Sequence, residues 1–297
     1  MQASANGRYY EEDSIHNIEA TFDIDYFNLH ALNLMQEEFI TSLAGELELH
    51  AKSATEAKGM LAVQDIQLTR PANSYTIDTL TFLADIDASG SDFFFRSDVL
   101  DASLTGNTRL SELGDALADH IDRYLDLPDS IVSDKDFIFD FGLDLKEPAF
   151  FTGFLIDGLH EFQLDTFKIH YHDANDVLQM KITMPSFAYD NIAVSDFQAF
   201  FDTTPEAAFA EFQASDLTVG VIALPKINLA SKFEPHRAMI NLSASDVNDS
   251  LNYNIGCKIL FQDSSYQIAL SPDDLIINYQ PWKIAGNKTL FLGSGLQ

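Results

Sequence analysis

Cysteine and basic side chains are scarce in this chain of 297 residues. Cys257 is the only cysteine, so no disulfide can form within the chain, and the cysteine usage suits either the cytosol or the periplasm. Lys and Arg number 17 against 46 Asp and Glu, which gives a net charge of −29. Binding to nucleic acid needs clustered basic side chains, and so does peripheral docking on anionic lipid head groups. The composition therefore argues against both kinds of partner.

Long hydrophobic runs are also missing. No window approaches the roughly 18 apolar residues of a membrane-spanning helix. The stretch Met1–Asp13 lacks the apolar core of a signal peptide and ends on three acidic residues, Glu11, Glu12 and Asp13. We therefore expect either a cytosolic protein or an internal piece of a longer, membrane-anchored chain.

Motifs that carry chemistry are lacking as well. There is no G-x-S-x-G, no phosphate-binding loop and no dinucleotide-binding glycine pattern. The segment Asp85–Gly90 begins like a calcium loop, but its twelfth position is the cation Arg96. His170 and His172 share a strand face without an evident third metal ligand. We expect no enzyme activity, no catalytic residue, no metal and no cofactor.

Alternation of apolar and polar residues, by contrast, runs through nearly the whole chain. A period of two is typical of a strand with one apolar face and one wet face. Hydrophobic residues make up 46% of the chain and include 24 Phe, which suit a protein core and an acyl-chain surface equally. The residues that we expect on apolar strand faces, and that are candidates for lining a lipid groove, are Phe22, Ile24, Phe137, Phe139, Phe141, Leu143, Leu145, Ile255, Cys257, Ile259 and Phe261.

The pattern predicts an all-β fold with a few short helices. The clearest helix covers about 110–127, with Leu113, Leu117, Ile121 and Tyr124 in one stripe and Pro128 after its end. A mixed apolar stretch over Pro148–Leu159 predicts a shorter helical segment. We expect a first β module over 1–129 that ends in the long helix, and a second, nearly all-β module over 130–297. The two would form one continuous, elongated sheet.

A hairpin around Arg70–Asn73 changes its alternation part-way along both arms. Leu61 and Val63 give way to Ile66 and Leu68, and the other arm, Tyr75–Ile86, slips in the same way. A one-residue slip of this kind predicts a β-bulge, which bends and twists a sheet.

One clear helix cannot cover the apolar faces of so many strands. The sheet must therefore fold over itself and leave either a dry, closed core or an open slot filled with lipid. The alternation alone does not decide between the two.

The organisation of the chain resembles the TamB (translocation and assembly module) and AsmA-like family of bridge-like lipid transfer proteins, in its Bacteroidetes-type members. The resemblance covers most of the chain and consists of strands followed by short leucine-rich turns. The segments that carry it are Ile18–Asp25 with Phe27–Leu34; Tyr75–Leu80, Arg96–Gly106 and the helix end Ile121–Leu125; and Tyr266–Pro272 with Asn278–Ile284.

The resemblance implies an elongated, curled antiparallel sheet, a β-taco, that encloses a hydrophobic groove. In such proteins the groove shields phospholipid acyl chains between the inner and outer membranes of Gram-negative cells, and the family is linked to outer-membrane protein assembly. The chain would be a periplasmic, internal segment of an inner-membrane-anchored envelope protein, with membrane contact through parts that it lacks.

Two other functions remain open from the sequence. A secreted or surface β-sandwich module could bind carbohydrate or protein, and Trp282, flanked by Tyr279 and Lys283, is its candidate cluster. A hydrolase on a β scaffold has no support beyond the abundance of carboxylates.

Overall fold

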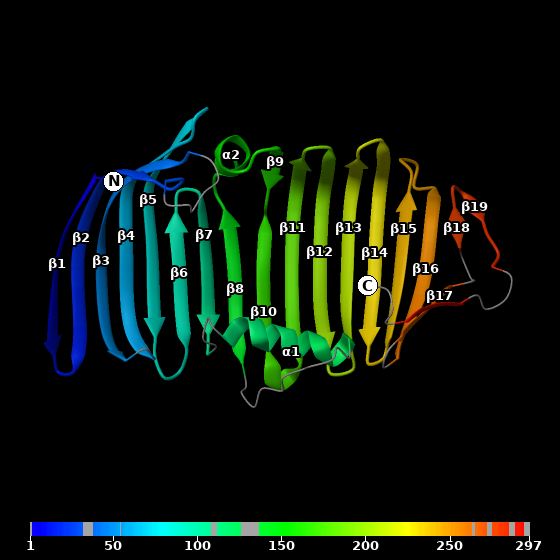
Figure 1. The fold of residues 1–297 in the computed structure, drawn as a ribbon. Coiled ribbons are helices and arrows are strands. Elements are labelled where there is room, and N and C mark those ends of the chain that lie inside the picture. The colour runs from blue at the N-terminus through cyan, green and yellow to red at the C-terminus, as the bar shows by residue number, and fades with distance from the viewer. Residues whose placement is uncertain are drawn as a thin grey trace. The chain divides into compact units, whose positions relative to one another are not determined.

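A computed structural model of the chain describes residues 2–31, 38–53, 55–107, 112–125, 137–262, 265–271, 275–284 and 289–293. Strands dominate it, and the predicted all-β fold with a few short helices is confirmed (Figure 1). Several residues used in the predictions lie outside the described residues, namely Leu32, Leu34, Pro128, Pro272 and the first residues of the expected second module, 130–136.

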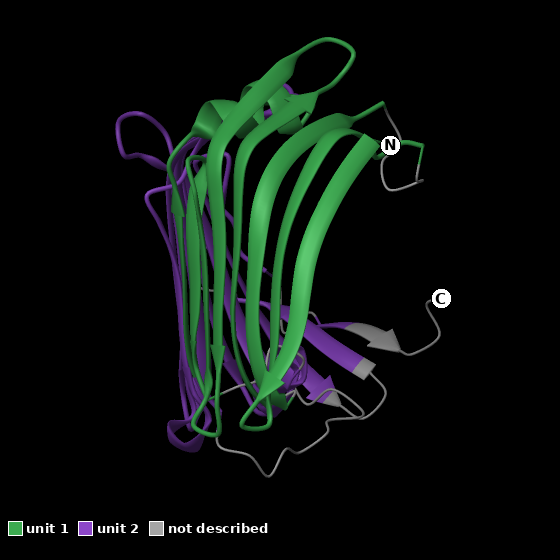
Figure 2. Ribbon diagram, turned by 90° about the vertical axis from the view of Figure 1, so that its left-hand side faces the viewer, with its two compact units in different colours: residues 1–110, 139–160 green, residues 111–138, 161–297 purple. Residues whose placement is uncertain are grey.

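The chain divides into two compact units, 1–110 with 139–160 (unit 1) and 111–138 with 161–297 (unit 2). The strands of each unit hydrogen-bond into an antiparallel sheet rather than two packed sheets. The strands of unit 1 are bowed along their length (Figure 2). These compact units do not test where a domain begins or ends, so the expected modules 1–129 and 130–297 stay a prediction.

In unit 1, eight strands pair in chain order from β1 to β8. They are followed by a short helix, α2, which begins with Pro148, and a π-helical turn, η2, as predicted for this stretch. The elements are β1 (Gln2–Glu12), β2 (Ile15–Asn28), β3 (Ile40–Ser53), β4 (Glu56–Thr69), β5 (Ser74–Ile86), β6 (Ser91–Ser97), β7 (Leu100–Gly106), β8 (Ile138–Leu145), α2 (Pro148–Phe150) and η2 (Phe151–Leu155).

In unit 2, strands β10 to β17 pair in chain order and are preceded by the helix α1. The elements are α1 (Leu113–Leu125), β10 (Thr166–His172), η3 (Asp173–Asn175), β11 (Val177–Tyr189), β12 (Ile192–Thr204), β13 (Ala207–Val219), β14 (Ile222–Glu234), β15 (Arg237–Ser245), β16 (Leu251–Gln262), β17 (Ser265–Leu270), β18 (Ile276–Ile277), β19 (Gln280–Pro281) and β20 (Thr289–Gly293). A further strand, β9 (Leu159–Gln163), crosses the boundary between the units.

Candidate functional site

One face of the unit 1 sheet is apolar from β2 to β8. Residues opposite each other in an antiparallel pair point to the same face, so the register identifies the side chains that share it. The pairs Ile24↔Leu43 and Leu47↔Leu61 lie on this face. Further pairs on it are Phe82↔Phe95, Phe93↔Leu104, Leu104↔Phe141, Ala102↔Leu143 and Leu100↔Leu145. The alternation read from the sequence therefore assembles into one apolar surface across the sheet.

Bulges keep this apolar face continuous along the strands. Val63 pairs with Leu80, and Ile66 pairs with Ile77, on either side of Asp65, whose φ is 54°. Val63, Ile66 and Ile77 are all buried in the same cluster. The slip predicted for both arms of this hairpin is confirmed, and it returns the second set of apolar side chains to the face of the first.

Asp98 holds the slipped arm of β5. Its carboxylate accepts hydrogen bonds from the backbone N–H groups of Asp78 at 2.7 Å and Thr79 at 3.0 Å. The β5–β6 ladder ends at Leu80↔Ser97, and the Asp98 carboxylate satisfies these two donors beyond that end.

The segment α2–η2 covers one end of the apolar face of unit 1. Phe150 and Phe154 are buried there in a cluster with Phe39, Ile66 and Val99. Ring contacts tie the cluster together, including Tyr75 with Phe150 and Phe39 with Phe154 at centroid distances of 4.9 and 5.8 Å.

The β4–β5 turn clamps this covering segment. Arg70 donates to the Phe154 carbonyl at 2.6 Å and to the Asp157 carboxylate at 2.7 Å. The Asn73 side-chain amide donates to the Gly153 carbonyl at 2.7 Å. These bonds satisfy carbonyls of the short helical segment that its own hydrogen bonds do not reach.

Unit 2 has an apolar sheet face of the same kind. Across it run the rows Phe167↔Ile182↔Ala199↔Phe212↔Leu229↔Leu242↔Ile255 and Ile240↔Cys257↔Leu270. Except for the buried Ala199 and the exposed Leu270, these side chains are half-buried. Sheet neighbours pack against them from the sides, while part of their outer surface stays open to solvent.

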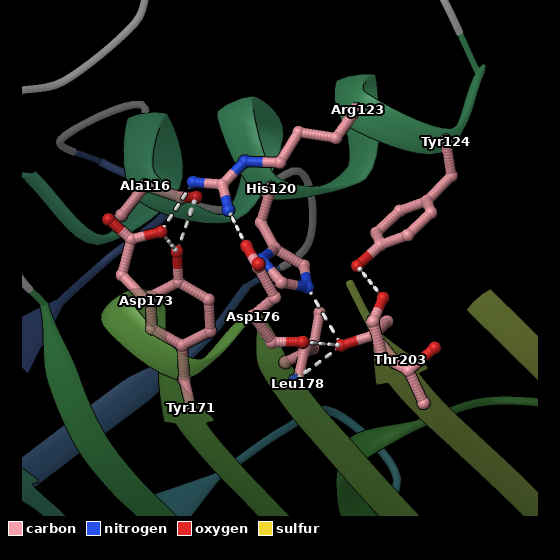
Figure 3. Close-up of polar contacts among 10 residues, drawn as sticks. Ala116, His120, Arg123, Tyr124, Tyr171, Asp173, Asp176, Leu178 and Thr203 are labelled. Carbon is pink, nitrogen blue, oxygen red and sulfur yellow. Dashed lines mark hydrogen bonds and ion pairs between the residues drawn. The ribbon is translucent and has the colours of Figure 1, made fainter. Parts of the chain in front are cut away.

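The helix α1 covers one end of this face (Figure 3). Its side chains Ala116, His120 and Tyr124 are buried, whereas Ile121 is 37% exposed. The predicted stripe of Leu113, Leu117, Ile121 and Tyr124 is therefore only partly the contact face. The buried line instead follows residues four apart, because positions i and i+4 stack on one side of a helix.

Polar contacts fasten α1 to the strand ends beneath it (Figure 3). Tyr124 donates to the Thr204 carbonyl at 2.8 Å, and the Tyr171 hydroxyl lies 3.0 Å from the Asp173 carboxylate and 3.3 Å from the Ala116 carbonyl. Arg123 forms ion pairs with Asp173, at 2.5 Å, and with Asp176. Tyr171 is 1% exposed, and burial raises the pKa of its phenol, so it stays a hydrogen-bond donor.

His120 is completely buried beneath α1 and is neutral. Thr203 Oγ1 donates its proton to the Asp176 carbonyl at 2.8 Å and accepts from the Leu178 N–H at 2.7 Å. Its remaining lone pair faces His120 Nε2 at 2.9 Å, so Nε2 carries the proton of the ring. The other nitrogen, Nδ1, has no partner among the described residues. Burial, with a smaller effect of Arg123, lowers the pKa of His120 to about 4.

The candidate groove residues divide into two groups. Phe137 and Phe139 are 5% and 1% exposed, so protein atoms already enclose them. The other nine are half-buried on the apolar faces or strand ends of the two units: Phe22, Ile24, Phe141, Leu143, Leu145, Ile255, Cys257, Ile259 and Phe261. Cys257 is half-buried, and desolvation raises the pKa of its thiol, which favours the unreactive form. The role of the candidate groove residues in lipid binding stays a prediction.

Part of the opposite face of unit 1 is polar. In unit 1, a hollow of about 490 Å³ on that side is lined by hydroxyl, amide and carboxylate side chains, including Ser4, Thr21, Asp23, Glu46 and Gln64. Around this hollow the two faces of the sheet differ in chemistry as the alternation predicts, whereas Met60, Leu83 and Phe94 form an apolar row elsewhere on the same opposite face.

Asp87 accepts from Ser89 and from the Gly90 N–H, so the loop that begins like a calcium site is a hydrogen-bonded turn. Within the described residues, no three His, Cys, Asp or Glu side chains gather as a metal site. No helix in that part of the chain is long and apolar enough to span a membrane.

No protein-family model matches the chain, and searches of curated proteins and of solved structures find no significant match. The resemblance to the TamB and AsmA-like family therefore rests on the sequence segments that carry it.

Proposed function

We propose that the chain is a non-enzymatic segment of a cell-envelope lipid-transfer and assembly protein, and that its apolar sheet faces bind phospholipid acyl chains. One observation carries the proposal. Each unit has an apolar face that continues across its sheet, and a helical segment, α2–η2 or α1, covers only one end of it. An apolar surface of this extent in water calls for a partner.

The chemistry of the uncovered part suits acyl chains. In unit 2 the row Phe212↔Leu229↔Leu242↔Ile255 has hydrocarbon side chains without polar groups. Burying an acyl chain there contributes ~0.8 kcal/mol for each CH₂ removed from water. A flexible chain needs no directional hydrogen bonds, so an open sheet face can hold it without a shaped pocket.

The cellular setting follows from the resemblance. As an internal, periplasmic segment of an inner-membrane-anchored protein, the chain would shield lipids between the two membranes and work with the outer-membrane assembly machinery. The net charge of −29 keeps such a surface soluble between binding events.

Mass spectrometry of lipids that co-purify with the protein tests this function. Leu242→Asp places a charge on the apolar face, whereas Asn241→Asp places the same charge one residue away on the opposite face. We expect phospholipid with the wild type and the Asn241→Asp variant, and little with Leu242→Asp. Thermal unfolding checks that both variants fold. Wild-type protein without lipid, or equal lipid in both variants, argues against the proposal.

A carbohydrate-binding function has one supporting observation. Trp282 and Tyr279 are 56% and 48% exposed, and the Tyr279 hydroxyl donates to Asp246 at 3.2 Å. Exposed rings with polar neighbours are suited to stacking on sugars. Glycan-array binding that is lost in Trp282→Ala would favour this function over lipid binding.

A further inference from the structure

Three hairpin tips of unit 2 carry exposed apolar side chains at the same end of the sheet. Ile192 pairs with Val219, and Val219 pairs with Ile222, so the β11–β12 and β13–β14 tips are adjacent. The pairing of Lys226 with Ser245 brings the β15–β16 tip to this end too. Figure 1 shows these tips along the upper ends of the strands. We call the following set the tip row: Tyr189, Ile192, Val219, Val221, Ile222, Val247 and Leu251.

The tip row is unusually exposed for apolar side chains. Val221 is 102% exposed and Val247 is 76% exposed, so neither packs on the protein. Turns normally use Gly, Asn, Asp or Ser, which suit the backbone and the solvent. Gly220 supplies the left-handed residue of the β13–β14 turn, with a φ of 58°, and Val221 adds nothing that the turn requires. An exposed valine at this position stabilises the protein or a complex only if an apolar surface or phase buries its side chain.

The tips are held in place by the backbone. The Gly220 N–H donates to the Asn191 carbonyl at 2.9 Å and joins two neighbouring tips. A fixed row of protruding side chains loses little conformational entropy when it enters an apolar phase.

From these observations we propose that the tip row is a membrane-contact surface that inserts into the interface of an electrically neutral lipid bilayer. A stable protein partner would need a surface of roughly 20–30 residues on each side, far more than this row of tips offers. A bilayer needs no complementary shape, and Tyr189 has the amphipathic ring that suits its interface. Asp190, Asp246 and Asp249 lie in the same turns, which favours zwitterionic over anionic head groups.

This surface goes beyond acyl-chain binding and does not rest on it. The tip row and the acyl-chain face of unit 2 are compatible in position. The helix α1 covers the apolar face near Thr203 and Thr204, and these residues lie at the opposite ends of the strands from the tips. A lipid leaving a bilayer at the tips would meet the uncovered part of the face.

Flotation with phosphatidylcholine vesicles tests the proposal. Val221→Asp changes a fully exposed side chain and leaves the fold intact, which thermal unfolding checks. We expect the wild type to float with the vesicles, and Val221→Asp to weaken its affinity by at least about tenfold. The matched control, Met239→Asp, changes an exposed apolar residue within β15 and should bind like the wild type. Because the contact is apolar, raising the salt concentration should not release the protein.

A fluorescent probe measures insertion of the tip row into the bilayer independently. Trp282 is the only tryptophan, so Val221→Trp in a Trp282→Phe background reports on the tip alone. We expect its emission to shift to shorter wavelength with vesicles and to be quenched by brominated lipid. Wild-type protein that does not bind vesicles, equal binding of Val221→Asp, or an unquenched probe overturns the proposal. Loss of co-purifying lipid in Leu242→Asp with unchanged flotation would separate the two functions.

Discussion

His120 and Gly45 show how single residues hold each sheet together. His120 fills the space between α1 and the strand ends, where its ring makes edge contacts with Tyr124 and Tyr171 at centroid distances of 5.5 and 5.2 Å. Gly45 lies under the ring of Phe22, so no side chain can be added there without moving the ring. Both residues determine how the side chains around them pack.

The docking of α1 should weaken in acid because of His120. Its pKa is about 4 in the folded protein against 6.5 for a free histidine, so between these two pH values release from the pocket takes up a proton. The contribution of neutral His120 to the docking of α1 is therefore fully present above about pH 6.5. It falls as the pH drops toward 4, by at most roughly 3 kcal/mol. Arg123 opposes protonation, whereas Asp173 and Asp176 favour it. Hydrogen exchange of α1 across this pH range measures the effect.

His120→Gln is the control for this titration. Glutamine keeps an N–H donor for Thr203 but does not titrate. The difference in α1 protection between the wild type and this variant should therefore depend on pH between 6.5 and 4. A difference that stays constant across this range would show that His120 does not control the docking.

Gly45→Ala should destabilise unit 1. The added Cβ would lie 2.6 Å from the Phe22 ring and 2.6 Å from the Ala62 carbonyl oxygen. Overpacking of this kind costs about 1–3 kcal/mol. In the matched control Gly59→Ala, the nearest atoms are 3.4 and 3.6 Å away, so the change should be neutral or slightly stabilising. Urea unfolding of both variants measures the difference, and equal stabilities would contradict the account.

At the scale of elements, the short helical segments that cover the sheets are fixed by hydrogen bonds and ion pairs from the strands rather than by the intrinsic stability of the helices. The segment α2–η2 spans only 148–155, too short to be stable as an isolated helix. The cluster of Phe150 and Phe154 supplies the apolar contact, and Arg70 fixes the segment over it. In unit 2, Arg123 and Tyr124 do the same for α1.

Arg70→Ala should therefore loosen the covering segment of unit 1. The substitution removes the bonds to the Phe154 carbonyl and the Asp157 carboxylate, and the Arg70 side chain is only 14% exposed. We expect a loss of about 1–3 kcal/mol in urea unfolding. Lys58→Ala removes an ion pair to Asp85 whose lysine is 71% exposed, so solvent screens the pair and the loss should be smaller than for Arg70→Ala. A reversed order of these two losses would argue against the clamp.

At the scale of the whole molecule, the alternation predicts the sheets well because side-chain direction in a strand has a fixed period. The bulges could also be predicted from Ile66, Ile77 and Leu80. An apolar residue that is one position out of the two-residue period can reach the apolar face only if a bulge shifts the strand. The edge strand β1 was missed, because its small and polar residues make no apolar row.

The contact face of α1 was predicted only in part from the sequence, which indicated Tyr124 but not His120. A histidine at position 120 looks like a solvent-facing residue, and only the strand ends beneath it show that Thr203 satisfies its ring. The tip row was missed for a similar reason. Apolar residues at strand ends look like the last members of a buried face until the turns place them in solvent.

The central claim is that the apolar sheet faces hold acyl chains. A photoreactive amino acid at Ile255, on the apolar face of unit 2, tests it most directly, with the same group at Asn254 on the opposite face as control. The account predicts that crosslinking in the presence of native phospholipid labels lipid from position 255 and not from position 254. Equal labelling from both positions, or no lipid from position 255 in a folded protein, would contradict it.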